Sequence, residues 1–307
     1  MTNTFQKPGS FYRGNLHTHS DRSDGALSPQ EVCHRYHEHG YDFIALTDHF
    51  IGQYDFPVTD TKLFRRDGFT TLLGAELHSG AMQNGEIWHL LAVGLPEDFT
   101  PPVDVHGFEA TPTQETGPEL ARRAYDAGAF VSIVHPQWSG LTMEDARSIE
   151  HAHAVETYNH SCQVDCQRAD GFATLDLLLS EKRKLNLIAT DDAHFSSTDY
   201  FGGWVMVKAG RNTPEDLLGA LKAGDFYSSQ GPLIHHLQWN DDSSVNFECS
   251  AAQTIIVQGH GSACVTHHES SITSGTLDLA KLRGSPWARF TVVDANGKCA
   301  FSNPHWF

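Results

Sequence analysis

Residues 15–19 read Asn15-Leu16-His17-Thr18-His19, and residues 187–194 read Leu187-Ile188-Ala189-Thr190-Asp191-Asp192-Ala193-His194. Each stretch carries two potential metal ligands, two positions apart, within or after a short apolar run. Side chains of a β-strand alternate between its faces, so His17 and His19 point to one side, as do Asp192 and His194. The two pairs predict a metal site at the ends of buried strands, where a β/α barrel places its chemistry.

Five further patches between these stretches carry the same types of residue. They read Ser23-Asp24-Gly25, Ile44-Ala45-Leu46-Thr47-Asp48-His49, Leu72-Leu73-Gly74-Ala75-Glu76, Ile87-Trp88-His89 and Val131-Ser132-Ile133-Val134-His135-Pro136. A single His after an apolar run is more often a hydrogen-bonded strand end, but seven coincidences predict one shared site. Nine such ligands exceed the three or four of one catalytic zinc, so we expect two or three divalent ions of zinc, iron or manganese.

The order and spacing of these motifs resemble the PHP (polymerase and histidinol phosphatase) family of metal-dependent phosphoesterases. The resemblance covers roughly residues 12 to 225 and rests on His17-x-His19, Ser23-Asp24-Gly25, Thr47-Asp48-His49, Gly74-Ala75-Glu76, His135-Pro136 and Asp192-Ala193-His194. It implies an α/β fold, a distorted (β/α)7 barrel, with a trinuclear metal centre. The end of the chain, from Val293 to Lys298 and from Ser302 to Pro304, more weakly resembles metallohydrolases of the CehA/McbA type.

The resemblance also implies how the nine ligands divide among the ions. The first ion would be held by His17, His19, Glu76 and Asp192. A second ion, to which Glu76 bridges, would be held by His89 and His135. The third would be held by Asp24, His49 and His194, with Asp24 in the place of a His that some relatives carry.

Composition limits the partners of the chain. Its 307 residues are 39% hydrophobic and contain no apolar stretch near the ~20 residues that span a bilayer. The start, Met1 to Gly14, lacks the apolar segment of a signal peptide, and the six cysteines have no C-x-x-C spacing, so we expect a cytoplasmic protein with reduced thiols. A formal charge of -17 disfavours long nucleic acid, whereas bound ions could still attract a small anionic substrate.

Helix signals alternate with the expected strands up to residue 225. Predicted helices begin at Ser28-Pro29-Gln30-Glu31, Gly117-Pro118 and Thr213-Pro214-Glu215-Asp216, and two more cover residues 141–150 and 168–184. Residues 53–68 and 97–116 lack periodicity and are predicted to be rim loops. From residue 226 short alternating stretches and turns prevail, which predicts a metallohydrolase barrel over residues 1–225 and a small β-rich C-terminal domain over residues 226–307.

The ligand set predicts a hydrolase. Two ions bridged by a carboxylate can share a hydroxide that is nucleophilic near neutral pH, and a small phosphoester, such as a nucleotide or sugar phosphate, suits this centre. The alternative substrate is a carbamate or amide, because the same hydroxide attacks carbonyl carbon. Cationic side chains beside the metals would favour phosphate, and an apolar pocket would favour the alternative. A non-catalytic metal-binding barrel is disfavoured by the complete ligand set.

Groups outside the ligand set are candidates for the remaining roles. His160 is the candidate proton donor to the leaving group, with a surface loop His as the other interpretation. Arg22 could bind a second phosphate or carboxylate, or could simply be solvated. The residues expected to line the pocket or contact substrate are Gln137, Trp138 and Asn159, although Trp138 could equally be core. Asp48 and Asp191 are expected to orient His ligands.

Overall fold

The computed structural model describes residues 4–102 and 113–307. The predicted rim loop at residues 97–116 therefore lies partly outside the described residues. No helix in the described ranges has both the length and the apolar character needed to cross a membrane.

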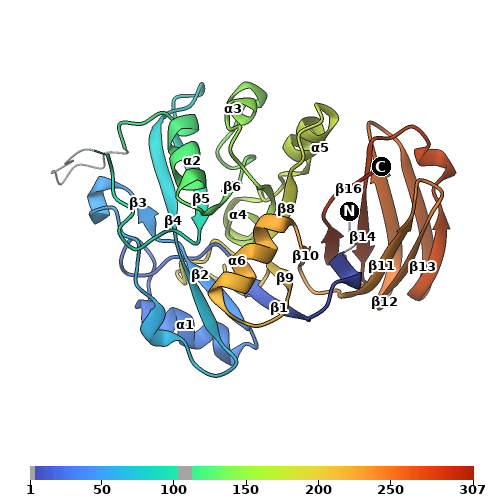
Figure 1. Ribbon diagram of the computed structural model, residues 1–307, viewed down its shortest axis with the longest axis horizontal. Coiled ribbons are helices and arrows are strands. Elements are labelled where there is room, and N and C mark those ends of the chain that lie inside the picture. Colours follow the sequence, from blue (N-terminus) through green and yellow to red (C-terminus); the bar gives the residue numbers. More distant parts are fainter. Residues whose placement is uncertain (1–3, 103–112) are drawn as a thin grey trace.

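The N-terminal two thirds of the chain form an α/β structure (Figure 1). Strands β1 (Ser10–Asn15), β2 (Phe43–Leu46) and β4 (Thr70–Ala81) are parallel neighbours, as are β6 (Phe130–Ile133), β7 (Ala154–Asn159) and β8 (Asn186–Thr190). Strand β5 (Ile87–Val93) joins the two groups and is antiparallel to both. The short strand β3 (His49–Phe50) pairs with β4, and β9 (Trp204–Ala209) runs antiparallel to β1.

The hydrogen-bonded strands form a large open sheet, and a closed (β/α)7 barrel is not confirmed. Strand β8 is one end of the path, and the antiparallel strands β5 and β9 interrupt a purely parallel order. The segments that follow β1 and β8 nevertheless meet, because Asp192 N donates to His17 O at 2.8 Å and His19 N donates to Ala193 O at 2.9 Å. This contact brings the first and last ligand motifs of the chain together.

The helices begin where the capping signals predict. Helix α1 (Pro29–Glu38) is capped by Ser28, α2 (Gly117–Asp126) by a Thr116 and Glu119 capping box, and α6 (Pro214–Ala223) by Thr213. Helix α3 is shorter than predicted, at Met143–Ser148. The predicted helix at residues 168–184 is α5 (Phe172–Ser180), and α4 (His160–Cys166) precedes it. The backbone of Gln167 is left-handed and ends α4, which separates the two helices.

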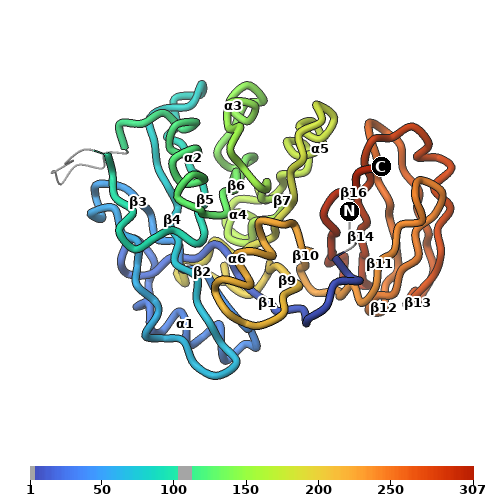
Figure 2. Tube along the Cα trace, viewed as in Figure 1, coloured from blue at the N-terminus to red at the C-terminus, as the bar shows by residue number. Residues whose placement is uncertain are grey.

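The C-terminal part of the chain is built of strands, as predicted. They are β10 (Phe226–Ser229), β11 (Ile234–Asn240), β12 (Ser244–Gly259), β13 (Cys264–Asp278), β14 (Trp287–Val293), β15 (Cys299–Ser302) and β16 (His305–Trp306). Strand β10 pairs with both β9 and β15, so the sheet continues across residue 225, where the sequence predicts a domain boundary. Figure 2 shows the chain start, from the short helix η1 (Thr4–Gln6), beside these C-terminal strands.

Two large apolar clusters support the α/β part. One packs α2 and α5 against the sheet through residues such as Leu120, Leu175 and Leu178, and the other packs α6 through Leu217 and Leu221. Burial of a Leu side chain contributes about 1.5 to 3 kcal/mol, so these clusters hold the strands that carry the ligand motifs.

Candidate metal centre

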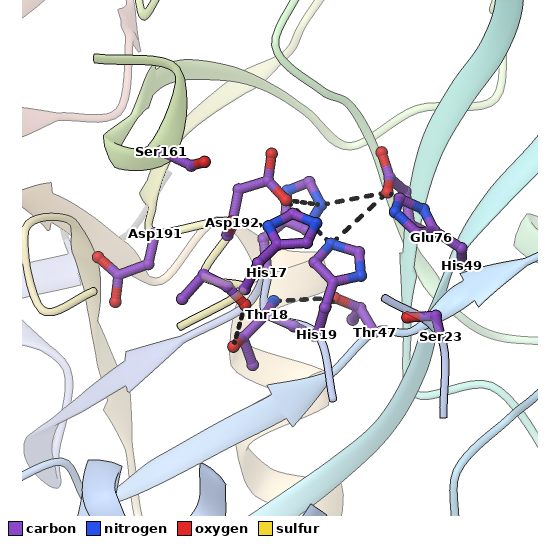
Figure 3. A network of polar contacts seen from close by, with 12 residues as sticks. His17, Thr18, His19, Ser23, Thr47, His49, Glu76, Ser161, Asp191 and Asp192 are labelled. Atoms are coloured by element: carbon purple, nitrogen blue, oxygen red, sulfur yellow. Dashed lines mark hydrogen bonds and ion pairs between the residues drawn. The ribbon is translucent and has the colours of Figure 1, made fainter. Parts of the chain in front are cut away.

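Apart from Asp24, which lies in a loop, the predicted ligands converge from six strands onto one cluster. Figure 3 shows five of them, His17, His19, His49, Glu76 and Asp192. His17 and His19 follow β1, His49 begins β3, Glu76 lies in β4 and Asp192 follows β8. His89 lies near the start of β5, and because β5 is antiparallel to β4, its start lies at the end where the parallel strands finish. An antiparallel strand thus contributes a ligand to the same face as the parallel ones.

Two ligand positions have strained backbones. The φ of His135 is 26° and that of Asp192 is 57°, in the left-handed region that non-glycine residues rarely adopt. Such conformations cost about 1 to 3 kcal/mol each and persist where the surrounding structure fixes them, commonly at functional sites. Here they direct both side chains into the cluster, where His135 Nε2 lies 2.9 Å from Glu76 Oε1.

The first predicted ligand set forms a compact group. His17 Nε2 lies 3.1 Å and His19 Nε2 2.9 Å from Asp192 Oδ1, and the same nitrogens lie 3.7 and 3.6 Å from Glu76 Oε2. Zn–N and Zn–O bonds of about 2.0 to 2.2 Å allow two ligands of one ion to lie up to about 4.3 Å apart. These separations therefore fit four ligands of a single ion.

The two oxygens of Glu76 face different groups of imidazoles. Oε1 lies 2.8 Å from His89 Nδ1 and 2.9 Å from His135 Nε2. Oε2 lies towards His17 and His19, and 2.7 Å from His49 Nδ1. One carboxylate can thus reach two ion positions, one through each oxygen.

The third predicted set lies on the open side of the cluster. Asp24 Oδ1 lies 3.3 Å from His49 Nε2 and 3.4 Å from His194 Nε2. The His19 ring lies between these imidazoles, with its centroid 4.3 Å from that of His49 and 4.2 Å from that of His194. His19 therefore belongs geometrically to this set as well as to the first.

Sequence reasoning missed one imidazole of the cluster. His78 is 2% exposed, and its Nε2 lies 2.8 Å from His49 Nδ1 and 3.9 Å from Glu76 Oε2. It follows Glu76 in β4 by two positions and lies opposite His89 in β5. The spacing Glu76-x-His78 repeats that of His17-x-His19, so the alternation of strand side chains was the signal that could have found it.

The cluster strongly perturbs its own ionisation. Burial opposes the charged form of Glu76 and Asp192, yet the surrounding imidazoles hold the pKa of both carboxyl groups well below their usual range. Burial would also raise the pKa of Asp24, but His49 and other imidazoles lower it to about 2. Burial, with His194 and His49 nearby, lowers the pKa of His19 to about 4. The carboxylates are thus ionised, as metal ligands need to be, and the pKa of His19 is lowered. Burial opposes the charged form of the other imidazoles too, but the same carboxylates raise the pKa of His17 and His135, and that of His49 to about 10.

Unpaired atoms support the fit of a cation. His17 Nε2 and Glu76 Oε2 are buried and make no well-aligned hydrogen bond in the described part of the chain, although Asp192 Oδ1 lies 3.1 Å from the first and His49 Nδ1 2.7 Å from the second. A buried polar atom without a partner costs about 1 to 3 kcal/mol, and a cation between these two atoms would remove that cost. Imidazole and carboxylate are ligands that suit zinc, iron and manganese.

The group that orients a His ligand is Glu156. Its Oε1 lies 3.0 Å from His17 Nδ1, and its Oε2 accepts from His135 N at 2.7 Å and from Asn159 Nδ2 at 3.0 Å. Asn159 also donates to Asp192 Oδ2 at 3.0 Å. A carboxylate on the far nitrogen of a His ligand fixes its tautomer and ring direction. The prediction gave this role to other residues, and the motif around Glu156 offered no spacing signal.

Asp48 and Asp191 do not contact the His ligands as predicted. Asp48 accepts from Ser20 and Ser23 and therefore holds the loop that carries Asp24. Asp191 accepts from Tyr36 Oη at 2.7 Å and from three backbone amides at residues 201–203. Both buried carboxylates stabilise loops, because hydroxyl and amide donors rather than imidazoles lie within reach.

A pocket of about 360 Å³ opens onto the cluster. It is lined by Asp24, His49, Glu76, His89, His135, Trp138, Ser161, Cys162, Asp165, Cys166, Asp192, His194, Ser196 and Asp199. Trp138 is 45% exposed, and its ring lies edge-on to those of His135 and His89 at 5.0 and 5.5 Å. Among the described lining residues there is no Lys or Arg, so any positive charge at the base of this pocket would come from bound ions.

The other predicted contacts lie outside this pocket. His160 turns towards Tyr158 Oη, 2.9 Å from its Nδ1, and its ring packs against Gly202. Asn159 is buried, and its side chain donates to Asp192 Oδ2 at 3.0 Å. The side-chain oxygen of Gln137 accepts a hydrogen bond from Asp170 N at 3.0 Å. Arg22 is exposed in the loop before Asp24. The geometry therefore gives no support to His160 as proton donor or to Asn159, Gln137 and Arg22 as pocket residues, whereas Trp138 does line the pocket.

Comparison with known proteins agrees with this geometry. The model of the PHP domain family matches residues 15–197, more than half of the chain, and the chain therefore belongs to this family. A two-domain protein from Bacteroides vulgatus that contains a predicted PHP-like metal-dependent phosphoesterase has a similar fold. The match covers 100% of this chain and 98% of that chain at 18% identity, with a TM-score of 0.55.

A second solved structure is less similar. An amidohydrolase from Chromobacterium violaceum is 14% identical, and the match covers 61% of this chain and 89% of that chain with a TM-score of 0.44. The comparison with curated proteins gives no match.

Proposed function

We propose that this chain is a metal-dependent hydrolase of small phosphoesters, of the nucleotide or sugar phosphate class. The proposal rests on the position of the Glu76 carboxylate at the base of a pocket. One of its oxygens faces His89 and His135, and the other faces His49. Divalent ions held there would supply Lewis acidity and lower the pKa of coordinated water to about 7.

We propose three ion positions, held by the residues that converge there. His17, His19, Glu76 and Asp192 form the first, Glu76, His89 and His135 the second, and His19, Asp24, His49 and His194 the third. Two positive charges per divalent ion exceed the negative charge of the three carboxylates in these sets. A loaded centre would therefore be cationic and would attract a phosphate without help from Lys or Arg.

The pocket residues suggest how a phosphoester would be held. Trp138 offers an exposed face beside His89 and His135, against which a base or aromatic leaving group could stack. Asp165 lines the pocket from α4 whereas His160 does not, so its position suits an exchange of a proton with the leaving group better. A small substrate remains the natural partner, since the pocket volume lies within the range of small-molecule sites.

One observation favours a second candidate, hydrolysis of a carbamate or amide. The lining residues that the structure describes include no Lys or Arg, while Trp138, Cys162 and Cys166 are not acidic. A phosphate substrate with a second anionic group would find no Lys or Arg among the described lining residues to bind that second group. A neutral carbamate or amide would not need a Lys or Arg for binding.

The experiment that separates the candidates is a substrate screen with the metal-reconstituted protein. Phosphomonoesters, phosphodiesters and carbamates would each be assayed with manganese, iron and zinc. Turnover of phosphoesters that is abolished in Glu76→Gln supports the proposal. Turnover of carbamates alone would replace it by the second candidate, and no turnover of any ester with fully bound ions would refute both.

We also propose that the fold consists of two domains. Strands β1 to β9 would form a distorted barrel, joined through the backbone bonds between residues 17–19 and 192–193. Residues 226–307 would form a separate β-rich domain, which the continuous pairing of β9, β10 and β15 attaches to the barrel. Limited proteolysis that releases a stable fragment ending near residue 225 would support this boundary.

A further inference from the structure

His78 is a buried imidazole of the cluster that the nine predicted ligands do not include. Its Nε2 lies 2.8 Å from His49 Nδ1, within hydrogen-bond distance. Its Nδ1 is buried and has no hydrogen-bond partner among the described residues. Among the described residues, the contact with His49 is therefore the only hydrogen bond of this side chain.

His49 uses its two nitrogens for different neighbours. Nε2 faces Asp24 at 3.3 Å on the open side of the cluster, where the third ion would lie. Nδ1 faces inwards, 2.7 Å from Glu76 Oε2 and 2.8 Å from His78 Nε2. A His that binds an ion through Nε2 keeps a proton on Nδ1, and this proton needs an acceptor.

In the part of the chain that the structure describes, Glu76 Oε2 and His78 Nε2 are the two acceptors within reach of that proton. Glu76 Oε2 also faces His17 and His19 at 3.7 and 3.6 Å, so an ion at the first position would take electron density from this oxygen. His78 belongs to none of the three proposed ion positions, although it lies close enough to His49 and Glu76 to be grouped with them. A neutral imidazole that holds its proton on Nδ1 presents a bare Nε2, and Nε2 of His78 lies 2.8 Å from His49 Nδ1, where it can accept the hydrogen bond.

We propose that His78 is the positioning residue of the third ion site, accepting the Nδ1 proton of His49 so that Nε2 of His49 binds the ion. The inference rests on the proposed metal centre but concerns a residue outside its ligand sets. When the first position is filled, His78 replaces Glu76 as the partner of His49. His78 touches no ligand of the second site through a hydrogen bond, so its effect should be confined to the third.

The test compares His78→Leu with His78→Gln in binding of Mn²⁺. Leu removes the acceptor, whereas Gln places an amide oxygen near the position of Nε2. We expect the third equivalent of Mn²⁺, measured by equilibrium dialysis and elemental analysis, to bind about 10- to 100-fold more weakly to His78→Leu. His78→Gln should recover most of this affinity, and the first two equivalents should be unchanged in both variants.

A matched control is His153→Leu. His153 is a half-buried His stacked between Phe130 and Tyr125 at the start of β7, away from the cluster, and its loss should leave all three equivalents in place. Unfolding of the metal-free variants by urea reports any purely structural effect. Unchanged binding of the third equivalent in His78→Leu would overturn the proposal, as would an equal weakening of all three or no recovery with Gln. A wild-type protein that binds no metal would instead refute the metal centre itself.

Discussion

Replacing Glu76 by Gln keeps the shape of the side chain and removes its charge. In the structure Glu76 is 1% exposed, and its oxygens lie within 2.9 Å of His89 and His135 on one side and of His49 on the other. The neutral amide would lose the carboxylate interaction with two ions at once. We therefore expect Glu76→Gln to lose two ions together, whereas His89→Gln should lose one.

The magnitude follows from the number of sites affected. Loss of a group that only orients a ligand costs 10- to 100-fold in metal affinity, so loss of a ligand itself should cost at least about 100-fold at each site. For two sites this amounts to about 10⁴ in the combined binding constant, or roughly 5.5 kcal/mol. Apart from His19, which belongs to two of the proposed positions, each other ligand faces a single position and should not approach this value.

The assay is elemental analysis after dialysis against a chelator of graded concentration. Glu181→Gln is the control, since Glu181 pairs with Arg147 at 2.6 Å on the surface and its loss makes the same change in charge. Full occupancy of both sites in Glu76→Gln, or loss of only one ion, would refute the bridging role of this carboxylate.

Three further predictions concern neighbouring groups. Glu156→Gln should weaken the ion held by His17 about 10- to 100-fold without changing the pocket, and retention of wild-type affinity in a chelator titration would contradict this. Asp24→His should shift the third site from manganese or iron towards zinc, which competition between the metals would reveal. Burial alone would lower the pKa of His49, but Glu76 and Asp24 raise it to about 10 from an ordinary value of 6.5. The metal-free protein should therefore lose stability to urea as the pH rises from about 6.5 to 10, and His49→Gln should flatten this part of the profile.

The first and last ligand motifs could be predicted from the sequence because their ligands follow apolar strands at a spacing of two. Alternation along an extended chain accounts for His17-x-His19, whereas Asp192-x-His194 reaches the same cluster with a left-handed backbone at Asp192 that alternation does not predict. The helix starts at residues 29, 117 and 214 likewise follow from local capping chemistry. Local patterns of this kind need no knowledge of the tertiary fold.

The contacts behind the ligands could not be predicted, because they join residues far apart in the chain. Glu156 meets His17 across 139 positions, and Asp191 meets Tyr36 across 155. Which face of α4 carries His160 towards Gly202 also depends on tertiary packing. The antiparallel direction of β5 is decided by its pairing with β4 and β6, which no local pattern specifies.

The central claim is that Glu76 lies between ions in a multinuclear centre. Anomalous diffraction from crystals grown with Mn²⁺ tests it most directly. We predict one peak on each side of the Glu76 carboxylate, one among His17, His19 and Asp192 and the other beside His89 and His135, with a third peak between Asp24 and His194. Crystals saturated with Mn²⁺ that show no peak, or a single peak that Glu76 does not contact, would contradict the account.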